Sequence, residues 1–168
     1  MRPDLRIENM DHVPFAAPIL AAWHVEAFSE WLGGWTVPDC LAELRTHGPA
    51  GTVPFTLVAL RGDEVLGSIS LIRDDPPAPA HLGPWLASFL VREDIRGRGI
   101  GSLLHNRLLA TAAAAGWQEI FLWTPGASAW YGARGWTAVS RFEAHGRESL
   151  IMRVETGPNR VSRPSFPG

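Results

Sequence analysis

The chain has 168 residues, of which 46% are hydrophobic and 19% charged, a composition typical of a globular protein. The formal net charge of −2, with arginine as the sole cationic residue type apart from histidine, gives no indication of nucleic-acid binding. No apolar run is long enough for a membrane helix, and the N-terminus lacks the apolar core of a signal peptide. Cys40 is the single cysteine, which excludes an internal disulfide and a cysteine zinc cluster. We therefore expect one cytoplasmic domain, with no metal site and no membrane or nucleic-acid partner.

The first half of the chain predicts a strand, two helices and a β-hairpin. Residues 4–10 alternate between polar and apolar as a half-buried strand does, and apolar residues at helical spacing predict a helix over 17–32. A second helix is predicted over 37–47, with a proline in its first turn. Two apolar runs joined by the sequence Arg-Gly-Asp-Glu predict a hairpin between residues 54 and 75.

The second half alternates strands and helices. After a loop over 76–84, a near-continuous apolar strand is predicted over 85–94, typical of a strand buried on both faces. The later elements follow in order as a helix over 100–115, a strand over 118–124, a short helix over 126–134, and strands over 135–144 and 148–155. This alternation predicts an α/β fold with a mixed, partly parallel sheet and helices on both faces. We place the domain over 1–155 and expect a flexible tail over 156–168, which is rich in Pro, Gly, Ser and Arg.

The most informative motif is the run Arg96-Gly97-Arg98-Gly99-Ile100-Gly101, which stands between a predicted strand and a predicted helix. Glycines at alternate positions indicate that a ligand approaches the backbone closely, and a helix N-terminus offers unpaired N–H groups and partial positive charge to a phosphate. A P-loop needs a lysine, which the chain lacks, and a dinucleotide-binding fingerprint needs a glycine where Ser102 stands. A glycine-rich turn without a ligand is the plain alternative.

The same run resembles the acyl-CoA pyrophosphate loop of GNAT-type N-acetyltransferases, and the segment 129–136, Ala-Trp-Tyr-Gly-Ala-Arg-Gly-Trp, resembles the tyrosine-containing segment of that family. The resemblance extends over residues 4–155. It implies a single-domain GNAT fold whose sheet is splayed near Val91, with acetyl-CoA as the co-substrate. The acceptor that it implies is an amine of a small molecule or a peptide, and a homodimer is left open.

The resemblance also implies roles for individual residues in binding acetyl-CoA. The backbone of Phe89, Leu90 and Val91 is expected to pair with the pantetheine. The pyrophosphate is expected on the backbone N–H groups of Gly97, Arg98, Gly99, Ile100, Gly101 and Ser102, with the Ser102 hydroxyl as a further donor. The side chains of Arg96 and Arg98 suit a phosphate by charge, although Arg98 also fits an exposed surface position. Thr124 stands where the family often carries an asparagine, so it keeps a hydroxyl and lacks the amide.

Tyr131 is the single tyrosine of the chain and matches the residue that protonates the leaving thiolate in the family. A phenol with a pKa near ~10 can return a proton to a thiolate with a pKa near ~8.5 at modest cost. The alternative for Tyr131 is an ordinary packing residue. The flanking Trp130 and Trp136 are interpreted as core residues.

The general base and the acceptor are less specified by the sequence. The position that carries a glutamate base in some family members corresponds to Trp123, which cannot accept a proton. His24, Glu26 and Glu30 are candidates by position alone, with solvated helix residues as the alternative. Nearby aromatic and acidic residues suit a cationic amine, although tryptophan at helical spacing is also typical of a core: Trp23, Phe28, Trp31, Trp35 and Asp39. A CoA-binding sensor or scaffold and a transferase for longer acyl-CoA are the competing functions.

Overall fold

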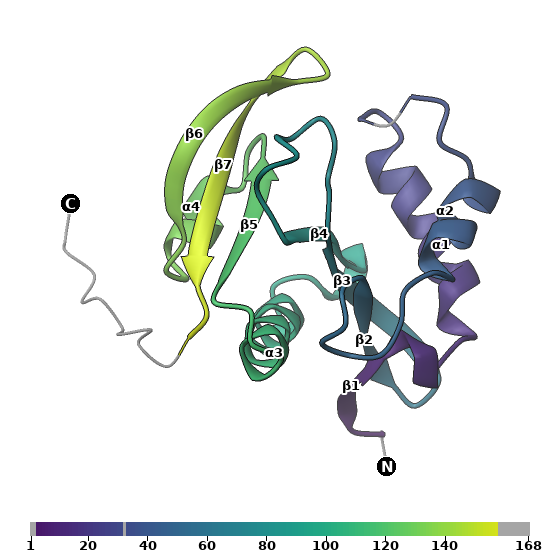
Figure 1. Ribbon diagram of the computed structural model, residues 1–168. Helices are drawn as coiled ribbons and strands as arrows, with labels where there is room; N and C mark the ends of the chain where they lie inside the picture. Colours follow the sequence, from purple (N-terminus) through teal and green to yellow (C-terminus); the bar gives the residue numbers. More distant parts are fainter. Residues whose placement is uncertain (1–2, 32, 158–168) are drawn as a thin grey trace.

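The computed structural model describes residues 3–31 and 33–157, which contain a seven-stranded mixed sheet in the order β1-β2-β3-β4-β5-β7-β6 (Figure 1). The strands are β1 (Leu5–Asn9), β2 (Phe55–Arg61), β3 (Glu64–Ile72), β4 (Trp85–Val91), β5 (Glu119–Thr124), β6 (Thr137–Ala144) and β7 (Arg147–Glu155). The α-helices are α1 (Ala16–Phe28), α2 (Val37–Leu44), α3 (Ile100–Ala114) and α4 (Ser128–Gly132), with short 3-10 helices at Met10–His12 and Glu93–Ile95. Strands and α-helices follow one another along the chain as predicted. The predicted tail over 156–168 lies, from residue 158 onward, outside the described residues.

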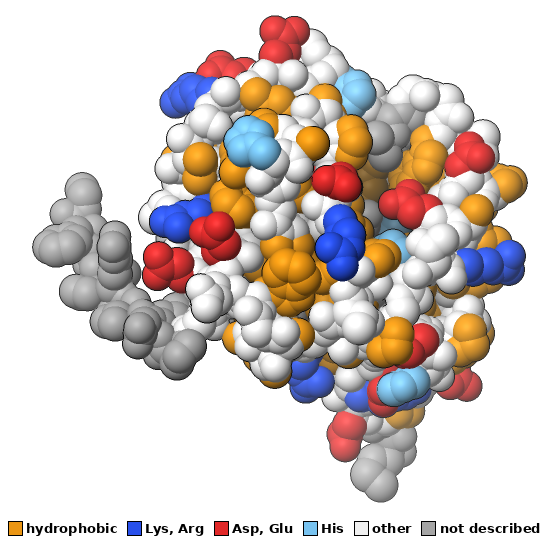
Figure 2. Space-filling model, viewed as in Figure 1, with side chains coloured by type: hydrophobic (Ala, Val, Ile, Leu, Met, Phe, Trp, Pro, Cys, Tyr) orange, Lys and Arg blue, Asp and Glu red, His pale blue; other side chains and the backbone are white. Residues whose placement is uncertain are grey.

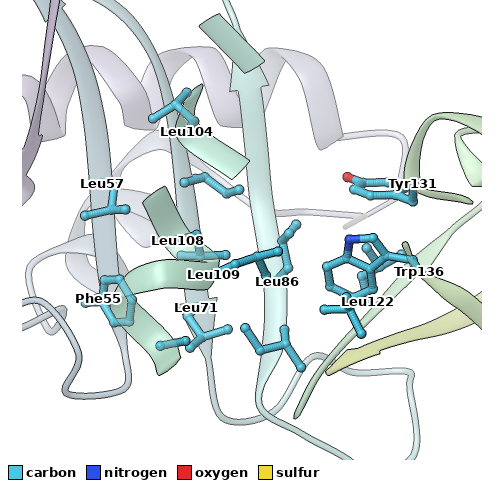
Figure 3. Packing of buried hydrophobic residues seen from close by; sticks show 14 of the residues in the cluster. Phe55, Leu57, Leu71, Leu86, Leu104, Leu108, Leu109, Leu122, Tyr131 and Trp136 are labelled. Atoms are coloured by element: carbon cyan, nitrogen blue, oxygen red, sulfur yellow. The ribbon is translucent and has the colours of Figure 1, made fainter. Parts of the chain in front are cut away.

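Side chains that alternate along β2 enter two hydrophobic cores on opposite faces of the sheet. Phe55 and Leu57 belong to the main core, where residues of α3 and β4 meet them (Figure 3). Val58 and Leu60 belong to a second core, which is closed by α1 and α2. Helices therefore cover both faces of one mixed sheet, and this confirms the predicted α/β class.

The two parallel strands, β4 and β5, are paired at Trp85 and Phe121 and then diverge. β5 continues antiparallel to β7 along its whole length, whereas β4 stays with β3. The predicted splay of the sheet is thus confirmed. The prediction that β4 is buried on both faces is wrong beyond Leu86, because the departing β5 leaves that half of the strand only partly covered.

A β-bulge interrupts β4 where it leaves β5. Ser68 pairs with Leu90 and Ser70 pairs with Ala87, so two residues of β4 lie opposite Ile69 alone. Ser88, within the bulge, has φ of 51°, which is rare for a residue with a side chain. Bulges of this kind re-aim backbone groups and are frequent beside active sites.

The two N-terminal helices are shorter than predicted. α1 ends at Phe28. In the tight turn that follows, the N–H of Trp31 donates a 2.9 Å hydrogen bond to the Phe28 carbonyl oxygen. α2 begins at a capping box, in which Thr36 Oγ1 accepts from the Asp39 N–H and the Asp39 carboxylate accepts from the Thr36 N–H, both at 3.2 Å. These turn and capping bonds, which hydrophobic periodicity does not report, set the helix boundaries.

Candidate active site

A cleft of about 650 Å³ opens where β4 and β5 diverge. It is walled by the second half of β4, the loop and first turn of α3, and α4. Most of the predicted acetyl-CoA residues line it, and so does Tyr131. Four more lining residues were not predicted from the sequence to bind acetyl-CoA: Ile95, Ala127, Trp130 and Arg134. The complete lining is Phe89, Leu90, Val91, Ile95, Arg96, Gly97, Gly99, Ile100, Gly101, Ser102, Ala127, Trp130, Tyr131 and Arg134. Arg98 and Thr124 do not line it.

The glycine loop has a backbone that other residues adopt only at a cost. Gly97 and Gly99 have φ of 78° and 83°, in the left-handed region, and Gly99 is the N-cap of α3. A Cβ built on either glycine meets no described atom within 4 Å, so packing does not explain the glycines. The first N–H groups of α3 have no intrahelical partner and carry the positive end of the helix dipole. The loop therefore presents bare, electropositive backbone to the cleft, a surface that fits the pyrophosphate of acetyl-CoA.

The two arginines of the loop differ in position. Arg96 donates from Nε to the carbonyl oxygen of Val91 at 2.9 Å, and this bond holds its side chain at the end of β4 beside the cleft. Arg98 is exposed and lies outside the cleft lining. Its position agrees with the alternative of a surface residue.

Arg134 of α4 contributes a cation that the sequence analysis missed. Its Nη2 donates to Ser102 Oγ and its Nη1 to the Trp130 carbonyl, both at 2.9 Å. Its guanidinium carbon lies 3.4 Å from the centroid of the Trp130 ring. Trp130 itself, interpreted from sequence as a core residue, is only half-buried and lines the cleft, with its ring 5.6 Å from that of Phe89. No local sequence pattern links Arg134 to Ser102, because the two residues lie 32 positions apart.

Tyr131 belongs both to the main core and to the cleft. Its ring packs edge-on against Trp136 with centroids 5.7 Å apart, and its hydroxyl points from α4 toward β4 (Figure 3). Burial raises the pKa of Tyr131 to about 12, and the nearby charge of Arg134 opposes this shift. The phenol therefore keeps its proton throughout the neutral range. Trp136 is a core residue, as interpreted.

Thr124 lies at the end of β5 with its hydroxyl already engaged. Its Oγ1 accepts from the N–H groups of Gly126 and Ala127, at 3.3 and 2.9 Å, and so shapes the turn that leads into α4. It lines a separate pocket of about 240 Å³, shared with Ser149. The structure does not bring Thr124 together with the other predicted residues.

The three candidates for the base on α1 and the turn after it lie outside the cleft lining. His24 is buried rather than solvated: its Nε2 is 3.1 Å from Ser68 Oγ, and burial, together with His47, lowers its pKa to about 4. Glu26 is exposed. Glu30 is exposed and forms an ion pair of 3.4 Å with Arg147 of β7.

The aromatic residues expected to wall the acceptor side separate into two groups. Trp23 and Trp35 pack against the second core. Trp31 instead faces β5, with its ring 6.1 Å from that of Trp123 and with the Arg147 guanidinium 4.4 Å from its centroid. Asp39, which was expected in that wall together with Glu26 and Glu30, is engaged in the α2 capping box.

Within residues 3–31 and 33–157, no group of three or more His, Cys, Asp or Glu side chains is placed to hold a metal ion. Among the helices of that same part of the chain, none has the length and apolar character needed to cross a membrane.

The splayed sheet and the cleft with its bare glycine loop are the arrangement expected of GNAT-type acetyltransferases. The family model described as acetyltransferase (GNAT) family matches residues 18–136. The chain therefore belongs to the GNAT acetyltransferase family, whose members use acetyl-CoA.

Solved structures confirm the fold. An aminoglycoside 6'-N-acetyltransferase complexed with coenzyme A is 19% identical, with a TM-score of 0.73 over 95% of this chain and 99% of that one. Aminoglycoside 6'-acetyltransferase type Ii is 20% identical, with a TM-score of 0.69 over the same shares of the two chains. Ard1 from Thermoplasma volcanium is 15% identical, with a TM-score of 0.66 over 90% of this chain and 97% of that one. A comparison with curated proteins gives no match.

Proposed function

We propose that the protein transfers the acetyl group of acetyl-CoA to a primary amine of a small molecule or peptide, by direct attack of the amine in a ternary complex. The observation that carries this proposal is the cleft, which has the electropositive loop of α3 in one wall and the Tyr131 hydroxyl in another. The loop suits a pyrophosphate and the phenol suits a leaving thiolate. Acetyl-CoA supplies the thioester that the amine attacks.

Several groups of the chain suit the binding of acetyl-CoA. The N–H groups of Gly97 through Ser102 are the pyrophosphate donors in this proposal. Arg134 adds a positive charge beside Ser102 and leaves the serine proton available for a phosphate oxygen, because Ser102 Oγ accepts the bond from Arg134. The backbone of Phe89–Val91, on the partly covered half of β4, is the partner of the pantetheine in this proposal, and the Val91 carbonyl also accepts from Arg96 Nε.

Tyr131 is the general acid of this proposal. With a pKa of about 12, its phenol does not lose a proton to a thiolate spontaneously. The transfer therefore requires that the phenol regain a proton from the amine nitrogen as it gives one to sulfur. This coupling suits a ternary complex, in which the amine and the thioester are present together.

The acceptor is tested with a panel of amines assayed for thiol release from acetyl-CoA. The panel contains arylalkylamines, polyamines, peptides with free N-termini and aminoglycosides, the last because two of the similar structures are described as aminoglycoside acetyltransferases. Acylated products are identified by mass spectrometry, and propionyl-CoA and succinyl-CoA are compared with acetyl-CoA. Amine-dependent release of thiol supports the proposal. Tight CoA binding without turnover on any amine would instead favour a sensor or scaffold.

A further inference from the structure

His105, in the first half of α3, is a fully buried histidine outside the lining of the cleft. Its Nε2 accepts a 2.9 Å hydrogen bond from the indole N–H of Trp136, and its Nδ1 lies 3.0 Å from Oδ1 of Asn106. An indole N–H only donates, so Nε2 carries no proton in this bond. The proton of the neutral ring is then on Nδ1, which donates it to Asn106. The contacts of His105 thus specify one tautomer of a neutral ring.

The rings that His105 contacts are the ones that pack against Tyr131. Tyr131 meets Trp130 and Trp136 edge-on, with centroids 5.1 and 5.7 Å away. The centroid of the His105 ring lies 5.5 Å from that of Trp130 and 6.1 Å from that of Trp136. Figure 3 shows the Trp136 ring beside the Tyr131 ring. His105 therefore supports both of the aromatic side chains that hold the phenol.

The hydrogen bond to His105 fixes the second of two ends of Trp136. The first end is the backbone, where the N–H of Trp136 donates to the Tyr131 carbonyl oxygen at 3.2 Å. The second is the indole, which reaches His105 across the gap between α4 and α3. Ser102, which accepts a bond from Arg134, stands three residues before His105, and residues at that spacing share one face of a helix. The helix that carries the glycine loop therefore also holds the segment around Tyr131.

A buried histidine is a costly way to fill a space, because its polar nitrogens lose their contact with water. An apolar side chain would fill the same space without that cost. What the polar pair adds is a single orientation, since a satisfied buried hydrogen bond defines one arrangement of its partners. A general acid depends on such orientation, because it must lie within hydrogen-bond reach of the atom that it protonates.

We propose that His105 is a positioning residue, which fixes the Tyr131 hydroxyl for proton transfer through its hydrogen bond to Trp136. This proposal rests on the acetyltransferase function proposed above, in which Tyr131 is the general acid. It requires an acceptor atom at the position of Nε2 and does not require the imidazole as such. A side-chain amide that reaches the Trp136 indole should therefore replace the histidine.

The first test compares His105→Gln with His105→Asn. Glutamine is long enough to place its carbonyl oxygen near the position of Nε2, whereas asparagine reaches only that of Nδ1. With the best amine of the panel, kcat is expected to fall about 5- to 20-fold in His105→Asn, less than the ~10²-fold that a 1 Å displacement can cost. His105→Gln is expected to stay within about twofold of the wild type, and the Kd for CoA within about twofold in both variants. Equal kcat values in the two variants would overturn the proposal.

A double-mutant cycle separates positioning of the hydroxyl from a general effect on the fold. In a Tyr131→Phe background there is no hydroxyl to position, so His105→Asn is expected to lower the remaining kcat less than about twofold. If His105→Asn costs as much in that background as in the wild type, it acts on the fold and the proposal is wrong.

The third test needs no turnover, because Tyr131 is the single tyrosine of the chain. Burial raises its pKa to about 12, so about one tenth of the phenol is ionised at pH 11, against about nine tenths for an ordinary phenol. Tyrosinate absorbance is read in a stopped-flow instrument after a jump to pH 11, before the chain unfolds. A larger early rise is expected in His105→Asn than in the wild type or His105→Gln, and Tyr131→Phe gives the baseline.

Equal rises in His105→Asn and His105→Gln would show that the bond to Trp136 does not hold the phenol in place, and would overturn the proposal. A wild type that is inactive on every amine would instead count against the transferase function, while the pH jump still decides whether His105 holds Tyr131.

Discussion

Arg134 Nη2 donates a 2.9 Å hydrogen bond to Ser102 Oγ, which joins α4 to the first turn of α3. The same guanidinium lies over the Trp130 ring, with its carbon 3.4 Å from the ring centroid. A permanent cation is thereby fixed beside the glycine loop, at the point where the helix dipole already favours an anion. The cleft thus combines backbone donors with positioned positive charge, since Arg96 also lines it.

Replacement of Arg134 by methionine is expected to weaken CoA binding. A charge-assisted hydrogen bond contributes roughly 1.5–3 kcal/mol, which corresponds to about a 10- to 100-fold rise in Kd. Isothermal titration with CoA measures the change. Arg107→Met, on an exposed position of α3, is the matched control for loss of one positive charge. Equal weakening in both variants would show that net charge, and not the contact with Ser102, is responsible.

Gly99→Glu is expected to abolish CoA binding while the protein remains folded. The new carboxylate would lie at the bare N-terminus of α3 and repel the pyrophosphate. Because φ at Gly99 is 83°, any side chain also adds backbone strain of about 1–2 kcal/mol.

Gly116→Glu controls for that strain at the other end of α3. Gly116 has φ of 92°, and a Cβ there also meets no described atom within 4 Å. Thermal unfolding is expected to show similar losses of stability in the two variants, with CoA binding retained in Gly116→Glu alone. A folded Gly99→Glu protein that binds CoA normally would contradict the proposal that the glycine loop binds the pyrophosphate.

The order of the elements could be predicted because each depends on local patterns. The alternating apolar residues of β2 and the glycines at 97 and 99 each carry their own signal within a few positions. The resemblance of two short motifs then placed the cleft on β4, α3 and α4. The predicted positions of the helix ends were less accurate, since the turn after Phe28 depends on local hydrogen bonds and not on hydrophobic spacing.

Contacts between distant residues account for what the sequence did not reveal. Ser102 and Arg134 lie 32 positions apart, and each is unremarkable in its own segment. The bulge at Ser88 depends on the register between β3 and β4, which alternation within one strand does not specify. Such pairings emerge only from the assembled fold.

Two buried histidines are expected to make stability depend on pH. His24 lies 3.1 Å from Ser68 Oγ and His47 lies 2.6 Å from Thr56 Oγ1, and burial lowers the pKa of each to about 4 from an ordinary value of 6.5. Between these values the unfolded chain binds more protons than the folded one, so the free energy of unfolding falls as the pH drops from about 6.5 to about 4. Each histidine contributes at most about 3 kcal/mol to this loss.

Urea unfolding at several pH values between 7.5 and 4.5 measures this slope. His24→Gln and His47→Gln are each expected to flatten it, even if they lower stability at pH 7.5. His81→Gln, at an exposed position, is the control and is expected to leave the slope unchanged. A wild-type free energy of unfolding that stays constant over this range would contradict the neutral, buried state of both rings.

Tyr131→Phe is expected to lower kcat by about 10²- to 10⁴-fold while the Kd for CoA changes less than about tenfold. Phenylalanine keeps the ring packed against Trp136, so the substitution removes the hydroxyl and little else. Pre-steady-state thiol release must first show that chemistry limits turnover, because slow product release would hide the effect.

The pH profile separates a general acid from a residue that only positions the substrate. Because the pKa of Tyr131 is about 12, a phenol acting as the acid stays protonated, and activity should not fall between pH 8 and about 10 through its ionisation. Trp136→Phe, which alters the packing beside Tyr131 but leaves the hydroxyl, is expected to lower kcat far less. If both variants lose activity equally, the hydroxyl contributes through packing of the α4 region and the acid role is wrong. If Tyr131→Phe alone is impaired and CoA binding is intact, the proton that sulfur receives comes from Tyr131.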